Sequence, residues 1–341
     1  MGVLIDEKVL LPEYLPDFLP HRENQIKELA NNLLPAAKGR KPLNTFIFGP
    51  VGIGKTACVK FVFREFEKYS EKVKTVYINC WDYKTTHSNL VKAAWELGIF
   101  VPRRGWSKDE IIEKIIEWLR KTKKSLIICL DEVDQLEEEV LYDWLRLNQY
   151  VENPIGIVFI SNHRDVFIDK EPRIRSSLRV EEIEFKSYTF NEMKDILMER
   201  AKLAFKSFDR AAVLLASSHA INKGGDVRIG LECLLKAGRV AERENAKRLE
   251  VDHVKKVTKK ISEVKSKIIE RKLSKIERII LNLLKRKSYT SGELYEKVLK
   301  RVKISERKLR DYINNLAKRK LIKIEEKRFK IRGYTRIISK I

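Results

Sequence analysis

Hydrophobic positions in the first half of the chain gather in short runs that are separated by longer segments with helical spacing. Each run is rich in β-branched, aliphatic or aromatic residues, which predicts buried strands at residues 45–48, 74–80, 125–130, 157–162 and 182–185. Between them, apolar residues recur every three or four positions, as at 23–34, 57–66 and 111–119, and predict helices. This alternation predicts an α/β domain built on a parallel sheet.

The pattern of the second half is helical from Phe190 onward and changes again near the end of the chain. Gly224 and Gly225 interrupt it, and Asp226 is placed to cap the next helix. A continuous basic pattern at 251–272 predicts a connector helix. Three helices at 275–287, 293–301 and 306–320 are then predicted, followed by strands at 321–325 and 329–338 with a turn at Gly333. This order predicts a winged helix, with residues 327–336 as the wing.

The distribution of charge along the chain indicates what kind of partner the protein binds. The 341-residue chain has a formal net charge of +23, and residues 273–341 contain 22 lysines and arginines against 7 acidic residues, a net charge of +15. The lysine-rich composition of a heat-adapted protein would spread its charge evenly. The concentration of charge in the last fifth of the chain instead predicts a polyanionic partner such as nucleic acid.

Cysteine usage and hydropathy indicate the compartment. Cys58, Cys80, Cys129 and Cys233 lack C-x-x-C spacing and lie among apolar residues, so we expect reduced core residues and neither a zinc site nor disulfides. No apolar run reaches 18 residues, and the N-terminus does not resemble a signal peptide. We expect a cytoplasmic, nucleoid-associated protein without a membrane partner.

One motif has specific chemistry. Residues 49–56 read GPVGIGKT, which matches the phosphate-binding loop G-x-x-x-x-G-K-[ST] and lies between a predicted strand and a predicted helix. Backbone N–H groups and the helix N-terminus bind phosphates, Lys55 adds a positive charge, and Thr56 is placed to bind Mg²⁺. The expected nucleotide contacts are Gly49, Pro50, Val51, Gly52, Ile53, Gly54, Lys55, Thr56 and Ala57.

Polar residues at strand ends complete the predicted site. The carboxyl end of the strand at 125–130 should meet the phosphate loop, since parallel sheets bind ligands at that edge. Asp131 is predicted to hold Mg²⁺ through water, and Glu132 to position and deprotonate the attacking water. Asn162 would help to orient that water, although a simple strand-end asparagine also fits. Arg228, in the first turn of its helix, can reach back toward a phosphate.

Two segments leave alternatives open. Pro20-His21-Arg22 forms either one wall of an adenine pocket or the start of the helix at 23–34. The basic turn at 101–106, which contains Arg103 and Arg104, is either a solvated loop whose tryptophan packs on the following helix or a protrusion that contacts DNA.

The third C-terminal helix has two unlike faces. Leu309, Tyr312, Ile313 and Leu316 share one face at i, i+3, i+4 and i+7 spacing. The other face carries arginine, which can read guanine edges in the major groove, and asparagine, which can read adenine edges. A solvated lysine-rich bundle is the alternative. The predicted DNA contacts are Arg307, Arg310, Asn314 and Lys318 on the helix, and Lys327, Arg328, Lys330 and Arg332 in the wing.

Taken in order, the phosphate loop, the strand LIICLDEVD, Asn162, the segment GGDVR and the basic C-terminal domain resemble the archaeal replication initiators of the origin-recognition/cell-division-cycle (Orc/Cdc) AAA+ family. The resemblance covers essentially the whole chain. It implies bound ATP or ADP with Mg²⁺, Asn162 and Arg228 as first and second sensors, an adenine bordered by Pro20, His21 and Arg22, and a DNA-contacting insert at 85–124. We expect an AAA+ base at 1–186, an α-helical lid with its connector at 187–272, and a winged-helix domain at 273–341.

The function expected from this resemblance is an ATP-switched initiator that binds double-stranded origin DNA and helps to recruit the replicative helicase. Other initiator paralogues are further expected partners. Two alternatives use the same parts: a DNA-binding regulator that loads no helicase, and an ATPase or helicase loader whose basic domain binds DNA without origin specificity.

The segment PRIRSSL at 172–178 departs from the AAA+ pattern. Many AAA+ proteins end it with an arginine that acts on a neighbour's ATP, whereas this chain has Ser177 and Leu178 there. Arg173 and Arg175 remain. We therefore expect slow, switch-like hydrolysis by a monomer, or by an assembly that forms only on DNA.

Overall fold

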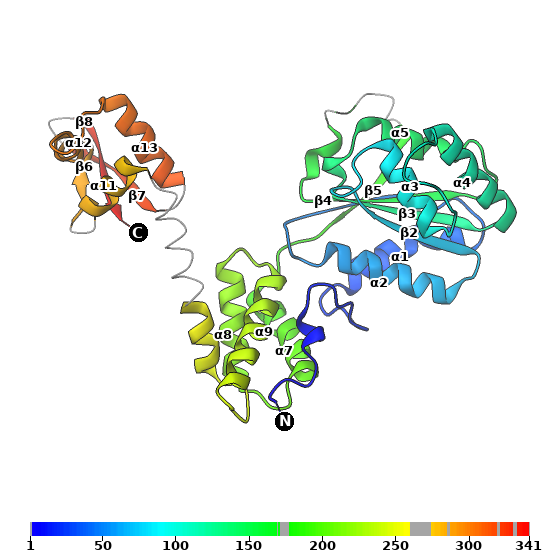
Figure 1. Cartoon of the computed structure of the whole chain (residues 1–341), viewed down its shortest axis with the longest axis horizontal. Helices are drawn as coiled ribbons and strands as arrows, with labels where there is room; N and C mark the ends of the chain where they lie inside the picture. The colour runs from blue at the N-terminus through cyan, green and yellow to red at the C-terminus, as the bar shows by residue number, and fades with distance from the viewer. Residues whose placement is uncertain are drawn as a thin grey trace. The chain divides into compact units, whose positions relative to one another are not determined.

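The computed structural model describes residues 2–168, 170, 177–259, 274–284, 287–318, 321–329 and 333–340. The chain divides into two compact units, Met1–Thr258 and Lys259–Ile341 (Figure 1). The predicted boundary between base and lid lies inside the first unit, and the three-domain division stays a prediction. Among the described helices, none is both long and apolar enough to cross a membrane.

A five-stranded parallel sheet with the order β2-β3-β4-β1-β5 forms the centre of the first unit. Its strands are β1 (Asn44–Phe48), β2 (Val73–Asn79), β3 (Ser125–Asp131), β4 (Ile155–Ser161) and β5 (Val180–Glu184). Every residue of β1, β3 and β4 is buried, as expected for parallel strands that are covered on both faces. The predicted strands of this sheet are confirmed to within two residues at their ends.

Helices cover both faces of this sheet. One face carries α1 (Glu23–Ala37) and α2 (Lys55–Tyr69), and the other carries α3 (Thr86–Glu96), α4 (Lys108–Thr122) and α5 (Glu138–Leu147) (Figure 1). The short 3-10 helices η2 (Val133–Gln135) and η3 (Arg164–Phe167) follow β3 and β4. Because β3, β4 and β1 are neighbours, their carboxyl ends bring Asp131, Ser161 and the loop after Phe48 to the same edge of the sheet.

A three-helix lid follows the sheet. It consists of α7 (Phe190–Ala204), α8 (Arg210–Asn222) and α9 (Val227–Arg243), and residues 251–259 are also helical. The N-terminal segment, which contains η1 (Glu7–Leu10), packs on this lid (Figure 1). There Leu4 forms a β-bridge with Phe205. The chain therefore passes between lid and sheet twice, at residues 20–23 and at residues 185–189. The predicted connector beyond Lys259 lies outside the described residues.

The second unit combines three helices with a small antiparallel sheet of order β6-β8-β7. Its elements are α11 (Lys275–Leu284), β6 (Tyr289–Thr290), α12 (Ser291–Leu299), α13 (Glu306–Lys318), β7 (Ile322–Phe329) and β8 (Gly333–Lys340). Leu309, Ile313 and Leu316 of α13 are buried in its core, as their spacing predicted. This is the element order expected of a winged helix.

The predicted break between the last two strands is wrong. Strand β7 continues past Glu325 to Phe329, and Gly333 is the first residue of β8, so the two strands pair without interruption from Ile322↔Lys340 to Phe329↔Gly333. The charged run after Glu325 hides this continuity in the sequence. A hairpin holds together through backbone hydrogen bonds, which charged residues form as well as apolar ones do.

The predicted cap of α9 forms, and the cysteines are buried as predicted. Asp226 caps α9, with its Oδ1 accepting a hydrogen bond from Arg228 N at 2.9 Å. All four cysteines are free and buried.

Candidate functional site

The loop between β1 and α2 is built to bind an anion. Gly54 is the N-cap of α2 in a left-handed conformation, with φ 88°, and no side chain caps the helix. The N–H groups of the first helical turn therefore lack the side-chain acceptor that normally satisfies one of them. Together with the positive end of the helix dipole, these groups make a phosphate site.

A cavity of about 620 Å³ lies over this loop. This volume is within the range of about 300–1,000 Å³ that is usual for small-molecule sites. The loop and the sheet edge form one wall, the lid forms the second, and the N-terminal segment forms the third. The lining includes Tyr14, Phe18, Pro20, Val51, Gly52, Ile53, Gly54, Lys55, Thr56, Ala57, Tyr77, Asp131, Glu132, Asn162, Tyr188, Arg200 and Arg228.

The ammonium group of Lys55 is buried between the loop and the end of β4. Its Nζ donates to the carbonyl oxygens of Gly49 and Pro50, both at 2.7 Å, and to Asn162 Oδ1 at 2.9 Å. Burial lowers the pKa of Lys55 to about 8. The attraction of Asp131 opposes this shift by raising the pKa, and the repulsion of Arg228 lowers it further. The negative charge of a phosphate would favour the protonated lysine again. Lys55 and Asn162 thus lie side by side at the carboxyl edge of the sheet.

Thr56 and Asp131 meet where the predicted metal site requires them. Thr56 Oγ1 donates to Asp131 Oδ2 at 2.6 Å, and the Tyr77 hydroxyl donates to the same oxygen at 2.7 Å. Asp131 Oδ1 accepts from Glu132 N at 2.9 Å. A hydroxyl and a carboxylate are the oxygen ligands that Mg²⁺ prefers, so this pair fits the metal.

Tyr77 is a site residue that the sequence did not indicate. A tyrosine inside a strand is ordinary, and only the β2–β3 register, which pairs Tyr77 with Cys129, brings it to Asp131. No local motif could have identified it. The alternation of side chains along β2 was the available signal, but it required the strand order to be known.

Glu132 lines the cavity from a left-handed backbone conformation, with φ 57°. Burial raises the pKa of Glu132, and the neighbouring charges of Asp131, Asp134 and Asp82 raise it further. Asp134 is itself held by Ser161, whose Oγ donates to Asp134 Oδ1 at 2.9 Å. A carboxylate with a raised pKa is the better proton acceptor, which suits the predicted base.

Arg228 lines the cavity from the lid, but its guanidinium pairs with Asp226. Arg228 Nε lies 3.0 Å from Asp226 Oδ1, and Nη2 lies 2.8 Å from Oδ2. Asp226 also lies against the phosphate loop, because a Cβ on Gly52 would come within 1.9 Å of Asp226 Oδ1. Val227 N donates to Gly52 O at 3.0 Å. Only glycine at position 52 lets the lid approach the loop this closely, and sequence reasoning identified Asp226 only as a cap.

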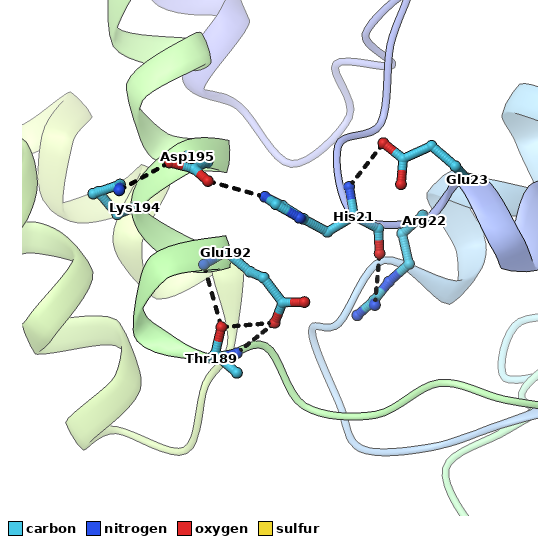
Figure 2. A network of polar contacts seen from close by, with 7 residues as sticks. All are labelled: His21, Arg22, Glu23, Thr189, Glu192, Lys194 and Asp195. Carbon is cyan, nitrogen blue, oxygen red and sulfur yellow. Dashed lines mark hydrogen bonds and ion pairs between the residues drawn. The ribbon is translucent and has the colours of Figure 1, made fainter.

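The three residues that were predicted to border the adenine do not all face the cavity. Pro20 lines the cavity. Arg22 is buried, and its guanidinium donates to Ile53 O and to Lys186 O. His21 Nε2 lies 3.2 Å from Asp195 Oδ2 on α7 (Figure 2). The geometry therefore assigns His21 and Arg22 contacts with protein groups, while Pro20 faces the space that a nucleotide would fill.

Two further lining residues come from segments without a recognisable motif. Tyr14 belongs to the N-terminal segment and Arg200 to α7, and the Arg200 guanidinium lies 4.7 Å from the centre of the Tyr14 ring. Arg200 also donates to Val9 O at 3.2 Å. The pairing joins segments far apart in the sequence, so only the folded lid shows it.

The predicted DNA contacts of the second unit are partly described. Arg307, Arg310 and Asn314 are exposed on α13, on the side away from the buried Leu309 and Leu316. Arg310 Nη2 pairs with Glu306 Oε1 at 2.9 Å. The backbones of Lys318, Lys327 and Arg328 are described but their side chains are not, and Lys330 and Arg332 lie outside the described residues.

The basic turn in the insert is exposed at its arginines and packed at its tryptophan. Arg103 and Arg104 are exposed, and the Arg103 guanidinium lies 5.3 Å from the centre of the Trp95 ring. Trp106 packs against the core of the domain. The packed tryptophan is what the solvated-loop interpretation expected, and a DNA contact stays a prediction. Arg173 and Arg175, the predicted arginines of the departing segment, lie outside the described residues.

Two family models match this chain. One, described as the AAA domain, matches residues 39–165, and the other, described as the Cdc6 AAA+ ATPase-type lid domain, matches residues 194–259. Together they cover most of the unit that forms the cavity.

Relatives and solved structures extend the similarity over most of the chain. The ORC1-type DNA replication protein 1 of Archaeoglobus fulgidus is 38% identical over 302 residues, which cover 84% of this chain and 74% of the relative. The protein of the same name from Sulfurisphaera tokodaii is 35% identical over 333 residues, or 91% and 83%. The Aeropyrum pernix ORC1 protein in complex with DNA has a TM-score of 0.70 at 31% identity and covers 99% of this chain and 93% of its own. Cdc6p from Pyrobaculum aerophilum, at a TM-score of 0.67 and 24% identity over 99% of this chain and 94% of its own, shares the fold.

Proposed function

Because the chain belongs to the archaeal ORC1-type DNA replication proteins and carries an AAA+ ATPase-type domain, we propose that it is a replication initiator whose binding to double-stranded origin DNA is switched by ATP. The reaction is the hydrolysis of ATP to ADP and phosphate. We take it to be slow, because the DNA contact is the output and the nucleotide sets its timing.

One observation carries the nucleotide part of this proposal. Groups from separate segments converge on a single cavity: the phosphate loop, the Thr56–Asp131 pair, Glu132, Asn162 and a lid arginine. A lone phosphate loop would indicate only that something phosphorylated binds. The acidic pair and the lid arginine supply what hydrolysis of a terminal phosphate needs in addition.

The phosphate-binding residues have distinct roles. The N–H groups of the loop and of the first turn of α2 bind the phosphate oxygens, and the protonated Lys55 adds its charge to the β- and γ-phosphates. Thr56 and Asp131 would hold Mg²⁺, which neutralises charge on those phosphates when it is bound. Tyr77 and the Glu132 N–H fix both oxygens of the Asp131 carboxylate.

Glu132 and Asn162 act on the attacking water. Glu132 accepts a proton from it, and Asn162, already hydrogen-bonded to Lys55, orients it from the end of the adjacent strand. The backbone strain at Glu132 supports this role, since left-handed conformations of non-glycine residues occur disproportionately at functional sites.

The lid supplies the switch. Arg228 pairs with Asp226 in this structure, so a bound terminal phosphate would compete with that carboxylate for the guanidinium. A residue that binds one partner without the terminal phosphate and another with it makes the position of the lid depend on the nucleotide. This dependence supports a timing role in preference to continuous turnover.

The second unit and the insert are the proposed DNA contacts. Arg307, Arg310 and Asn314 lie on the exposed face of α13, which we propose enters the major groove as the recognition helix of a winged helix. Arg103 and Arg104 of the insert would contact the backbone. Recruitment of the replicative helicase and association with initiator paralogues complete the proposal, and both rest on the family resemblance.

Footprinting on origin DNA from the source organism, with ATP and ADP compared, tests this function. We expect protection of a discrete repeated element and a nucleotide-dependent change in affinity. Lys55→Ala should bind no nucleotide and lose that dependence, whereas Arg146→Ala, on the exposed surface of α5, should behave as the parent does.

Two outcomes would contradict the proposal. Uniform, strongly salt-sensitive protection of all sequences would instead support a loader or regulator without origin specificity. Identical affinity for DNA in the presence of ATP and of ADP would show that the nucleotide does not switch DNA binding.

A further inference from the structure

Both chain passages between sheet and lid meet at the side chain of Arg22. This arginine occupies the N-cap position of α1 without a side-chain capping hydrogen bond, and only 5% of its surface is exposed. Among the residues that the structure describes, no carboxylate forms an ion pair with it. Its guanidinium is compensated by backbone carbonyls and aromatic rings instead, so its position depends on where those groups lie.

Three segments supply the carbonyl acceptors. Arg22 Nη1 donates to His21 O at 3.1 Å in the first passage, and Nη2 donates to Lys186 O at 3.0 Å in the second. Nε and Nη2 donate to Ile53 O in the phosphate loop, at 3.2 and 3.1 Å. Moving any one of these segments would leave a buried, charged donor without its acceptor, which is costly. Arg22 therefore holds both passages and the loop in one arrangement.

Two aromatic rings and Gly49 of the phosphate loop add further contacts among the same segments. The Arg22 guanidinium lies 3.8 Å from the centre of the Tyr188 ring and 5.2 Å from that of Phe185, so it stacks on the second passage as well as bonding to it. A Cβ on Gly49 would come within 2.1 Å of Phe185 O. The phosphate loop and the second passage are thus in direct backbone contact, and Phe185 N donates to Phe48 O at 2.8 Å beside it.

The same segments connect to the lid. Figure 2 shows the His21 ring reaching Asp195 on α7, while Thr189 and Glu192 form the capping box that begins this helix. The residue before Arg22 is therefore tied to the lid, and the acceptor Lys186 lies three residues before that cap. A displacement of Arg22 would be passed to α7 by both routes.

We propose that Arg22 is a positioning residue that couples the phosphate loop to the orientation of the lid. Phosphates bound in the loop would fix the Ile53 carbonyl, and Arg22 would then fix the second passage and α7. The inference rests on the proposed nucleotide site, but it gives Arg22 a role other than contact with adenine. Arg22→Lys keeps the charge but removes the planar fork that reaches two carbonyls at once.

The test measures the distance between sheet and lid directly in the full-length chain. Glu113 on α4 and Asn222 at the end of α8 are exposed, so Glu113→Cys and Asn222→Cys can carry spin labels, while the four native cysteines are buried. Pulsed electron paramagnetic resonance gives the distance distribution without nucleotide and at saturating Mg-ADP or Mg-ATP. A fluorescent ADP analogue defines saturation for each variant. Arg146→Lys is the matched control, because the Arg146 guanidinium also stacks on a ring, that of Tyr142, and donates to the Tyr150 hydroxyl.

We expect the distribution of the parent and of Arg146→Lys to narrow to a single distance at saturation. Arg22→Lys should stay at least twofold broader at saturation, with nucleotide affinity at least fivefold lower. Narrowing of Arg22→Lys to the parent distribution would overturn the inference. If Arg22→Lys does not fold, Asp195→Ala, at a half-buried site, decides, since broadening supports the coupling and an unchanged distribution refutes it. A parent that binds no nucleotide would instead overturn the proposed function, and the inference with it.

Discussion

At the scale of single residues, the carboxylate of Glu132 differs from that of Asp131 because their surroundings differ. Asp131 accepts three hydrogen bonds, whereas Glu132 faces the cavity with a raised pKa. We predict that Glu132→Gln binds nucleotide within about twofold of the parent but loses ~10²–10⁴ in turnover, the range typical of a general base. Phosphate release and nucleotide titration separate the two effects, and turnover equal to that of the parent would show that the base lies elsewhere.

Tyr77 should affect the metal more than the nucleotide. Tyr77→Phe removes one of two hydroxyl donors to Asp131 Oδ2. Loss of such a partner to a metal ligand typically costs roughly tenfold in metal affinity or more, so the Mg²⁺ concentration for half-maximal nucleotide binding should rise by about this factor. Tyr69→Phe, at a tyrosine that is 70% exposed, is the control. An unchanged Mg²⁺ requirement in Tyr77→Phe would contradict the role.

Lys55 predicts a pH dependence with opposite signs for folding and binding. Its pKa of about 8 in the fold lies below the value of 10.5 for an unperturbed lysine. Its burial therefore destabilises the unliganded protein fully below pH 8, and this penalty disappears as the pH rises from about 8 toward 10.5. Phosphate needs the protonated form, so nucleotide affinity should fall above pH 8, by up to about tenfold per unit.

Calorimetry in buffers of different ionisation enthalpy can measure the expected uptake of a proton by Lys55 on nucleotide binding near pH 9. Lys55→Arg cannot lose its proton in this range and should show no such uptake. Uptake of the same size in both proteins would assign the proton to another group.

At the scale of elements, the start of α9 combines a cap with a charge. Asp226 caps the helix, pairs with Arg228 and lies against Gly52 of the phosphate loop. Asp226→Ser keeps a capping side chain, so the free energy of unfolding should change little. Asp226→Ala removes the cap, so the free energy of unfolding should fall by about 1 kcal/mol. Removal of the carboxylate frees Arg228 from an exposed pair worth ~0.2–1 kcal/mol, so nucleotide affinity should rise by up to about fivefold in Asp226→Ser. A fall in affinity would mean that the carboxylate helps to hold the bound state.

Elements with local signals could be predicted, and contacts between distant elements could not. Buried strands such as β3 were predicted from their composition, and the phosphate loop from its motif. No local sequence pattern could predict the contact of Leu4 with Phe205 or the burial of Arg22, because both depend on which segments the fold brings together. The strand β7 was predicted too short because charged residues carry no hydrophobic alternation.

At the scale of the whole molecule, the distribution of charge predicts how DNA binding responds to salt. Residues 273–341 carry +15 of the total +23. If about six phosphates are neutralised, the logarithm of the affinity should fall with the logarithm of salt concentration with a slope of about −5. Lys327→Ala should reduce this slope by about 1, and Arg310→Ala should relax base preference instead. A slope near zero would show that the protein does not contact the DNA phosphates.

The N-terminal segment also constrains the order in which the protein can be completed during synthesis. Leu4 pairs with Phe205, so during synthesis Leu4 must wait for a partner that lies some two hundred residues later in the chain. At about 5–20 residues per second, this delay is on the order of ten seconds or more. The sheet can form in that interval, but the third wall of the cavity cannot. A newly made chain therefore gains its complete nucleotide pocket only after the lid has emerged.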